Sequence, residues 1–85
     1  MLSSKTRKTL SAIFSNPTKS DIRWTDIESL FLALGAEISE GAGSRVRIKL
    51  NGRRGNFHRP HPQPTTDKGA VRSVQRFLKE AGVEP

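Results

Sequence analysis

Hydrophobic side chains recur along this chain with two different spacings, and each spacing predicts one kind of element. Apolar positions three and four residues apart, typical of the buried side of a helix, occur before Asn16-Pro17, over residues 25–34 and over residues 67–81. Strict alternation, typical of a strand, occurs over residues 36–40 and 45–50. With the segment that follows residue 52 as a third strand, the expected order is helix, helix, three antiparallel strands, helix.

Each predicted helix has a capping residue at its start and a helix-breaking residue at its end. The predicted starts are Ser3 or Ser4, the capping box Thr25 to Glu28, and Thr66 or Asp67. The predicted stops are Asn16-Pro17, Gly35 and Gly82. Trp24, just before the second helix, is expected to be a core or lid residue rather than a platform on which bases stack.

Asn51-Gly52 joins two segments that should pair as an antiparallel hairpin. Asn-Gly is the preferred two-residue turn and it fixes the register, so that Val46 lies opposite Phe57 on a largely apolar face. The other face is polar, and its expected cross-strand pairs are Lys49 with Arg54, Arg47 with Asn56, and Arg45 with His58.

These elements predict an α+β domain in which the helices cover one face of a three-stranded antiparallel sheet in two layers. The other sheet face, with the polar row of the hairpin, stays open. A chain of 85 residues supports one modest core, and we assign residues 1–20 to an N-terminal helical extension and residues 21–85 to the domain itself. Prolines at 60, 62 and 64 should hold the chain extended after the third strand.

The composition narrows the possible functions. A net charge of +7 and a pI near 10.9 favour binding to nucleic acid or to an anionic surface. The sequence has no cysteine, which excludes disulfides and thiolate zinc sites, and no apolar run of the roughly 20 residues that a spanning helix needs. We therefore expect a cytoplasmic protein without a membrane partner. His58 and His61 lie on an extended, proline-rich segment where they do not point the same way, so we expect no metal and no cofactor.

The open face favours phosphate as the ligand. It carries cations without an aromatic side chain, and such a surface suits contact with the nucleic-acid backbone better than base stacking. Structured or double-stranded RNA, recognised by its shape and phosphates, is the expected partner. The last helix has a second basic stripe, which is equally consistent with a solvated surface and consists of Lys68, Arg72, Arg76 and Lys79.

Several segments, taken in order, resemble the HicA toxin family. They are Gly43-Ser44 at the start of the middle strand, His61-Pro62 after the third strand, and the closing segments Gly69 to Val74 and Leu78 to Gly82. The resemblance covers about residues 22–83. It implies a double-stranded-RNA-binding-like fold, cleavage of messenger RNA as an endoribonuclease, and neutralisation by a HicB antitoxin.

Arg45 departs from the family pattern, in which the residue after Gly-Ser is usually a histidine taken as catalytic. Arginine is almost always protonated, which makes it a poor base but a good bidentate phosphate ligand. In the predicted register His58 lies about 5 Å from Arg45 on the same face. We therefore predict that His58 is the general base, with Arg45 at the position that is usually histidine. The predicted RNA-binding residues are Ser44, Arg45, Arg47, Lys49, Arg54 and Asn56.

Other interpretations of the same residues remain open. Arg45 in place of histidine is also consistent with a noncatalytic RNA-binding or antitoxin-binding module on the same fold. His58 could serve only to hydrogen-bond the neighbouring loop. A third possibility is a protein-interaction domain whose basic face docks an acidic partner.

Overall fold

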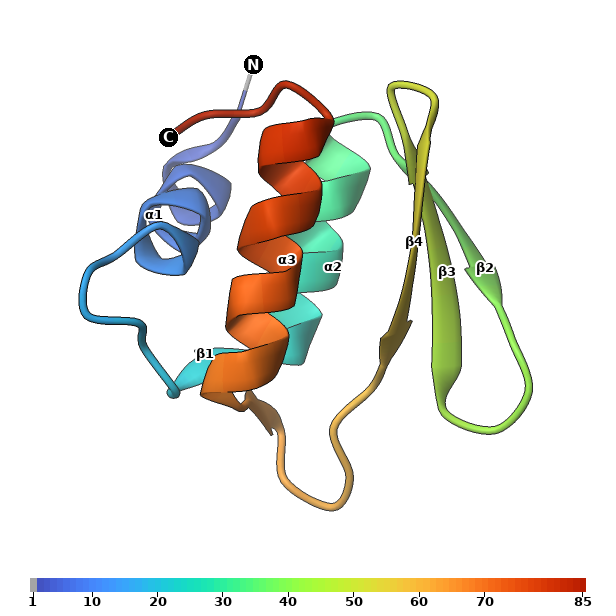
Figure 1. The fold of residues 1–85 in the computed structure, drawn as a ribbon. Helices are drawn as coiled ribbons and strands as arrows, with labels where there is room; N and C mark the ends of the chain where they lie inside the picture. The colour runs from blue at the N-terminus through green and yellow to red at the C-terminus, as the bar shows by residue number, and fades with distance from the viewer. Residues whose placement is uncertain (1) are drawn as a thin grey trace.

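The computed structural model describes residues 2–85 and arranges the helices and the main sheet in layers, as Figure 1 shows. Two helices, α2 and α3, pack on one face of a sheet with the strand order β2-β3-β4, and α1 lies on their far side. Two short strands, β1 and β5, pair separately. The elements are α1 (Ser4–Ile13), β1 (Ile22–Arg23), α2 (Trp24–Ala33), β2 (Glu37–Glu40), β3 (Arg45–Leu50), β4 (Arg53–His58), β5 (Thr65–Thr66) and α3 (Lys68–Glu80). The predicted α+β class and antiparallel three-stranded sheet are confirmed.

The hairpin of β3 and β4 has the predicted register. Val46 lies opposite Phe57 and Arg45 opposite His58, and the Asn51-Gly52 turn has positive φ at both residues, 50° and 80°. Asparagine and glycine are the residues that tolerate this left-handed conformation, which explains why the turn forms here. The Asn51 side chain also donates to the Ala81 carbonyl at 2.8 Å, and this bond ties the hairpin to the end of α3.

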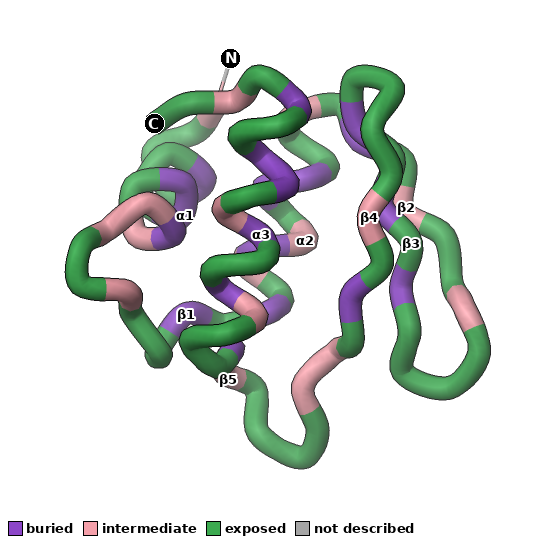
Figure 2. The backbone as a smooth tube through the Cα atoms, in the orientation of Figure 1, coloured by how far each residue is buried: buried purple, intermediate pink, exposed green. Residues whose placement is uncertain are grey.

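The core fills the space between the sheet and the helices α2 and α3 and continues between these helices and α1, as the burial pattern in Figure 2 shows. Trp24 is 4% exposed, so its predicted place in the core is confirmed. An aromatic cluster links both helices to β4, since the Phe57 ring centroid lies 6.0 Å from that of Phe31 and 5.7 Å from that of Phe77. The α2 and α3 helices are thereby fixed against the sheet face opposite the polar row.

Two of the three predicted helix caps are confirmed. The Ser3 hydroxyl accepts from the Thr6 amide at 3.2 Å, and the Asp67 carboxylate accepts from the Ala70 amide at 2.8 Å. The predicted capping box at the start of α2 is wrong, because the N-cap residue is Arg23, two residues before Thr25, and it makes no side-chain cap hydrogen bond. The carboxylate of Glu28 accepts instead from the indole of Trp24 and from Arg59.

The strand pair β1-β5 was not predicted. Thr65 and Thr66 pair with Arg23 and Ile22, and two-residue strands are too short to show an alternating pattern. The predicted extended segment at residues 60–64 is a bent loop.

The α1 helix adds a third layer behind α2 and α3, so the expected two-layer arrangement is wrong in this respect (Figure 1). Within residues 2–85 no helix is long and apolar enough to cross a membrane.

Candidate nucleic-acid interface

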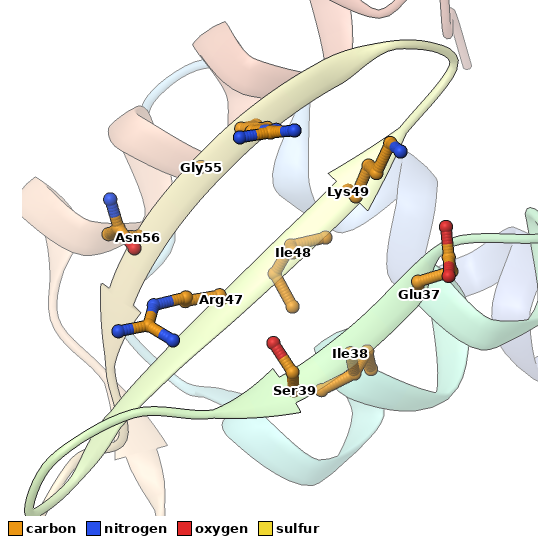
Figure 3. A pocket seen from close by; sticks show the side chains of 9 residues that line it. Glu37, Ile38, Ser39, Arg47, Ile48, Lys49, Gly55 and Asn56 are labelled. Atoms are coloured by element: carbon orange, nitrogen blue, oxygen red, sulfur yellow. The ribbon is translucent and has the colours of Figure 1, made fainter.

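The open face of the main sheet carries the polar residues in rows that run across the strands. β3 supplies Arg45, Arg47 and Lys49, and all three are exposed because the alternate residues of this strand enter the core. β4 supplies their exposed partners, which are His58, Asn56 and Arg54 respectively. The structure therefore brings together every predicted site residue on the two strands, and Figure 3 shows Arg47 and Asn56 extending from neighbouring strands.

β2 extends two of these rows, and the predicted site included no residue of this strand. Glu37 lies opposite Lys49, and Ser39 lies opposite Arg47. A shallow depression crosses all three strands at this place (Figure 3), and its lining comprises Glu37, Ile38, Ser39, Arg47, Ile48, Lys49, Arg54, Gly55 and Asn56. Glu37 partly offsets the charge of Lys49, which lies directly opposite it, so the positive charge is concentrated around Arg45, Arg47 and Arg54.

The row of Arg45 and His58 lies at the end of the hairpin, beside the loop of residues 41–44. Both side chains are exposed, and within residues 2–85 neither makes a hydrogen bond or an ion pair. His58 is thus not bonded to the neighbouring loop. Directly opposed residues of an antiparallel pair have Cβ atoms about 5 Å apart, so the imidazole and the guanidinium can contact the same phosphodiester group.

The loop of residues 41–44 has a compact hydrogen-bonded backbone. The Gly41 amide donates to the Arg45 carbonyl at 2.9 Å, and the Arg45 amide donates to the Ala42 carbonyl at 3.2 Å. Gly43 has a φ of 64°, which glycine adopts without strain. A Cβ at position 41 would lie 3.0 Å from the Cβ of Arg45, so glycine also allows the close approach there. Ser44, a predicted RNA-binding residue, is exposed beside Arg45.

Arg59 follows β4 directly and carries the ion pairs at this end of the sheet, which the sequence analysis missed. Its Nε donates to Glu28 Oε2 at 2.7 Å, and its Nη1 and Nη2 donate to the Glu40 carboxylate at 2.5 and 2.8 Å. The bonded Arg59 guanidinium lowers the pKa of the Glu40 carboxyl, and the hydrogen bonds from Arg59 to Glu40 and then Glu28 raise the pKa of Arg59. The sequence analysis assigned Glu28 to a capping box, so its ion pair with Arg59 was not predicted.

A comparison with protein families shows which family this chain resembles. The family model described as the HicA toxin of bacterial toxin-antitoxin systems matches residues 24–83. The chain belongs to the HicA toxin family. This confirms the resemblance that the ordered segments indicate and places the protein among bacterial toxins of toxin-antitoxin systems. A search of curated proteins found no match, and a search of solved structures also found none.

The HicA match spans every element that builds the open face. It begins at Trp24, the first residue of α2, and ends after α3, so it contains β2, β3 and β4 and leaves out α1.

The basic stripe predicted on the last helix, α3, lies outside the sheet face. Its Lys68, Arg72 and Arg76 are exposed, and the Lys79 ammonium lies 5.9 Å from the centroid of the Phe14 ring.

His61 does not lie on the open sheet face. It is exposed in the loop after β4, where it lines a depression with Ser20, Pro60 and Asp67, among others. The part of the chain that the structure describes contains no group of three or more histidine, cysteine, aspartate or glutamate residues placed to hold a metal ion. The histidine that does lie on the open face is His58, at the end of β4 and opposite Arg45.

Proposed function

We propose that this HicA family member is an endoribonuclease toxin that binds and cleaves messenger RNA at the open sheet face. The observation that carries the proposal is the cross-strand pair of Arg45 and His58, exposed and unbonded beside the loop of residues 41–44. An imidazole and a guanidinium on one row supply a proton acceptor and a phosphate ligand together. We also propose that the fold is double-stranded-RNA-binding-like and that the protein acts in the bacterial cytoplasm.

The proposed reaction needs a base for the ribose 2′-hydroxyl and cations for the phosphate. His58 takes the 2′-hydroxyl proton as the 2′-oxygen attacks the adjacent phosphorus, and the bond from phosphorus to the 5′-oxygen breaks. The products are a 2′,3′-cyclic phosphate and a 5′-hydroxyl, whose proton comes from the imidazolium just formed or from water. Arg45 and Arg47 bind the phosphate oxygens and stabilise the charge that develops on them.

The remaining exposed residues of the face are proposed to position the RNA. Arg54 and Asn56 lie further along the hairpin from His58, so they reach neighbouring phosphates, and Ser44 reaches the nucleotide next to Arg45. Lys49 lies opposite Arg54 and contacts the RNA with its charge partly offset by Glu37. Residues 21–85 form the proposed RNA-cleaving domain, and residues 1–20 form an added helical extension. A HicB antitoxin would neutralise the toxin by covering the same cations.

The test compares two histidines of the same chain. Wild type, His58→Ala and, as the matched control, His61→Ala are induced in growing bacteria without antitoxin, and cleavage of purified RNA is followed in parallel. Removal of a general base typically lowers the rate by about 10²- to 10⁴-fold, so His58→Ala should lose toxicity and cleavage while His61→Ala keeps both. Full toxicity and full cleavage by His58→Ala would show that His58 is not the base.

A noncatalytic RNA-binding module is the second candidate, and Arg45 in place of histidine is the feature that favours it. This candidate predicts that wild type retards RNA on a gel and leaves it intact at high protein concentration. A combined Arg45→His and His58→Ala variant sharpens the test, since it returns an imidazole to the same row from the other strand. Under the nuclease proposal this variant regains part of the cleavage that His58→Ala loses.

A further inference from the structure

Arg59 differs from the other cations near the open face because its guanidinium is held by two carboxylates. It donates four hydrogen bonds in all. Nε and Nη2 donate to Glu28, and Nη1 and Nη2 donate to Glu40. Arg45 and Arg47 have no acidic partner within residues 2–85. An RNA phosphate at Arg59 would have to compete with these two carboxylates, so a role other than phosphate binding is indicated.

The contacts of Arg59 hold both ends of the loop of residues 41–44. Its side chain binds Glu40, the last residue before this loop. Its backbone amide donates to the carbonyl of Ser44, the last residue of the loop, at 2.9 Å. Since Arg59 also directly follows His58, one residue connects the base proposed above, the start of the loop and its end.

The same network is anchored in the core through α2. Glu28 accepts hydrogen bonds from both Arg59 and the indole of Trp24, and the Trp24 ring lies 6.0 Å from that of Phe57 between centroids. Trp24 and Phe57 are buried, so they have little freedom to move. The loop beside Arg45 is therefore fixed to the rigid part of the molecule rather than left free at the sheet edge.

We propose that Arg59 is a positioning residue, which clamps the loop of residues 41–44 and so sets Arg45 against His58 for reaction with RNA. This inference rests on the proposed function for its effect on cleavage. The ordering of the loop is independent of that function and can be measured without RNA. A misplacement of about 1 Å in a reacting group can lower a rate by about 10²-fold, which makes such a clamp important for the chemistry.

The test uses variants that separate the charge of Arg59 from its geometry. Arg59→Gln removes the charge and most of the donors, whereas Arg59→Lys keeps the charge but cannot bind both carboxylates in the same way. Glu40→Gln opens only the exposed side of the network and leaves the Glu28 pair, so it remains informative if an Arg59 variant does not fold. Arg53→Gln is the matched control, since Arg53 is an exposed arginine of β4 without an ion pair in the described residues.

The expected result is a selective loss of turnover. For both Arg59 variants kcat should fall by about tenfold to hundredfold with KM changed less than threefold, while Arg53→Gln keeps the wild-type kcat. Thermal unfolding is measured alongside, because a merely structural role would lower the unfolding temperature without a selective loss of kcat in the folded protein. Equal kcat for Arg59→Lys, Arg59→Gln and Arg53→Gln would overturn the proposal.

A second readout distinguishes failure of this inference from failure of the proposed function. Exchange of the backbone amide hydrogens at positions 45 and 59 is measured in the free protein. It should accelerate at least tenfold in Arg59→Gln but not in Arg53→Gln. If wild type does not cleave RNA yet exchange accelerates, the nuclease proposal fails and the clamp stands. If wild type cleaves RNA and exchange is unchanged, the clamp is wrong and the nuclease proposal stands.

Discussion

The affinity of the open face for RNA should depend on salt through a small, countable set of cations, and Arg47→Gln tests this most directly. Arg47 lies in the middle row, is exposed and has no acidic partner in the described residues. Arg45 and Arg54 are likewise exposed and without an acidic partner in the described residues, whereas Lys49 lies opposite Glu37. We therefore expect three phosphates to be neutralised by wild type and two by the variant.

The magnitude follows from counterion release. Each neutralised phosphate contributes about 0.7 to 0.9 to the slope of log Kd against log salt, so the slope should be about 2.1 to 2.7 for wild type and about 1.4 to 1.8 for Arg47→Gln. Between about 50 and 200 mM salt, affinity should fall about 20- to 40-fold for wild type and about 7- to 12-fold for the variant. Glu37→Gln should steepen the slope by at most about 0.7 to 0.9, because it removes the acidic residue opposite Lys49.

Fluorescence anisotropy with a labelled RNA whose 2′-hydroxyls are methylated measures this slope, since such an RNA lacks the nucleophile and is not cleaved. Arg72→Gln is the matched control, because it removes the same charge from the exposed side of α3. Its slope should equal that of wild type. An unchanged slope in Arg47→Gln, or an equal flattening in Arg72→Gln, would refute the assignment of the open sheet face as the RNA-binding surface.

Three further predictions concern stability and chemistry. Arg59 lowers the pKa of Glu40 below its ordinary 4.5, so this pair stabilises the fold above pH 4.5, and the stabilisation is lost as pH falls through the lowered value. The difference in urea midpoint between wild type and Glu40→Gln should therefore shrink in acid. A difference that grows in acid would contradict this prediction. Gly55→Ala should destabilise the fold by about 1–3 kcal/mol in urea unfolding, because its Cβ would lie 2.9 Å from the Phe57 and Phe77 rings, and unchanged stability would argue against this packing. Cleavage should persist in excess EDTA and leave 2′,3′-cyclic phosphate ends detectable by mass spectrometry, whereas loss of activity on chelation would exclude the proposed side-chain mechanism.

The strong local signals of the sequence predicted most of the fold. Asn51-Gly52 determined the turn, and the turn together with the alternation over residues 45–50 determined the complete register of the hairpin. Apolar periodicity located all three helices, and Ser3 and Asp67 marked two of their starts. These features depend on residues close together in the chain, which is why they could be recognised without a structure.

The features that could not be predicted depend on contacts between distant segments. Arg59 binds acids that lie 19 and 31 residues away in the chain, and no local pattern indicates that these carboxylates meet. The residues from Thr25 to Glu28 match the capping-box pattern, but the Glu28 carboxylate accepts hydrogen bonds from Trp24 and Arg59 instead. Tertiary contacts thus override a local signal at the point where the helix joins the candidate site.

The geometry of the candidate site is a consequence of the core beneath it. Val46, Ile48 and Leu50 are at most 2% exposed, and a slip of one residue in the hairpin would turn them to solvent and bury cations in their place. Loss of three such side chains from the core costs about 1.5–3 kcal/mol each, which together rivals the whole stability of a small domain. The core therefore keeps Arg45 opposite His58 although the two side chains need no contact with each other. A site defined by the row, rather than by one strand, can take its base from either strand, and an arginine at position 45 is compatible with catalysis for that reason.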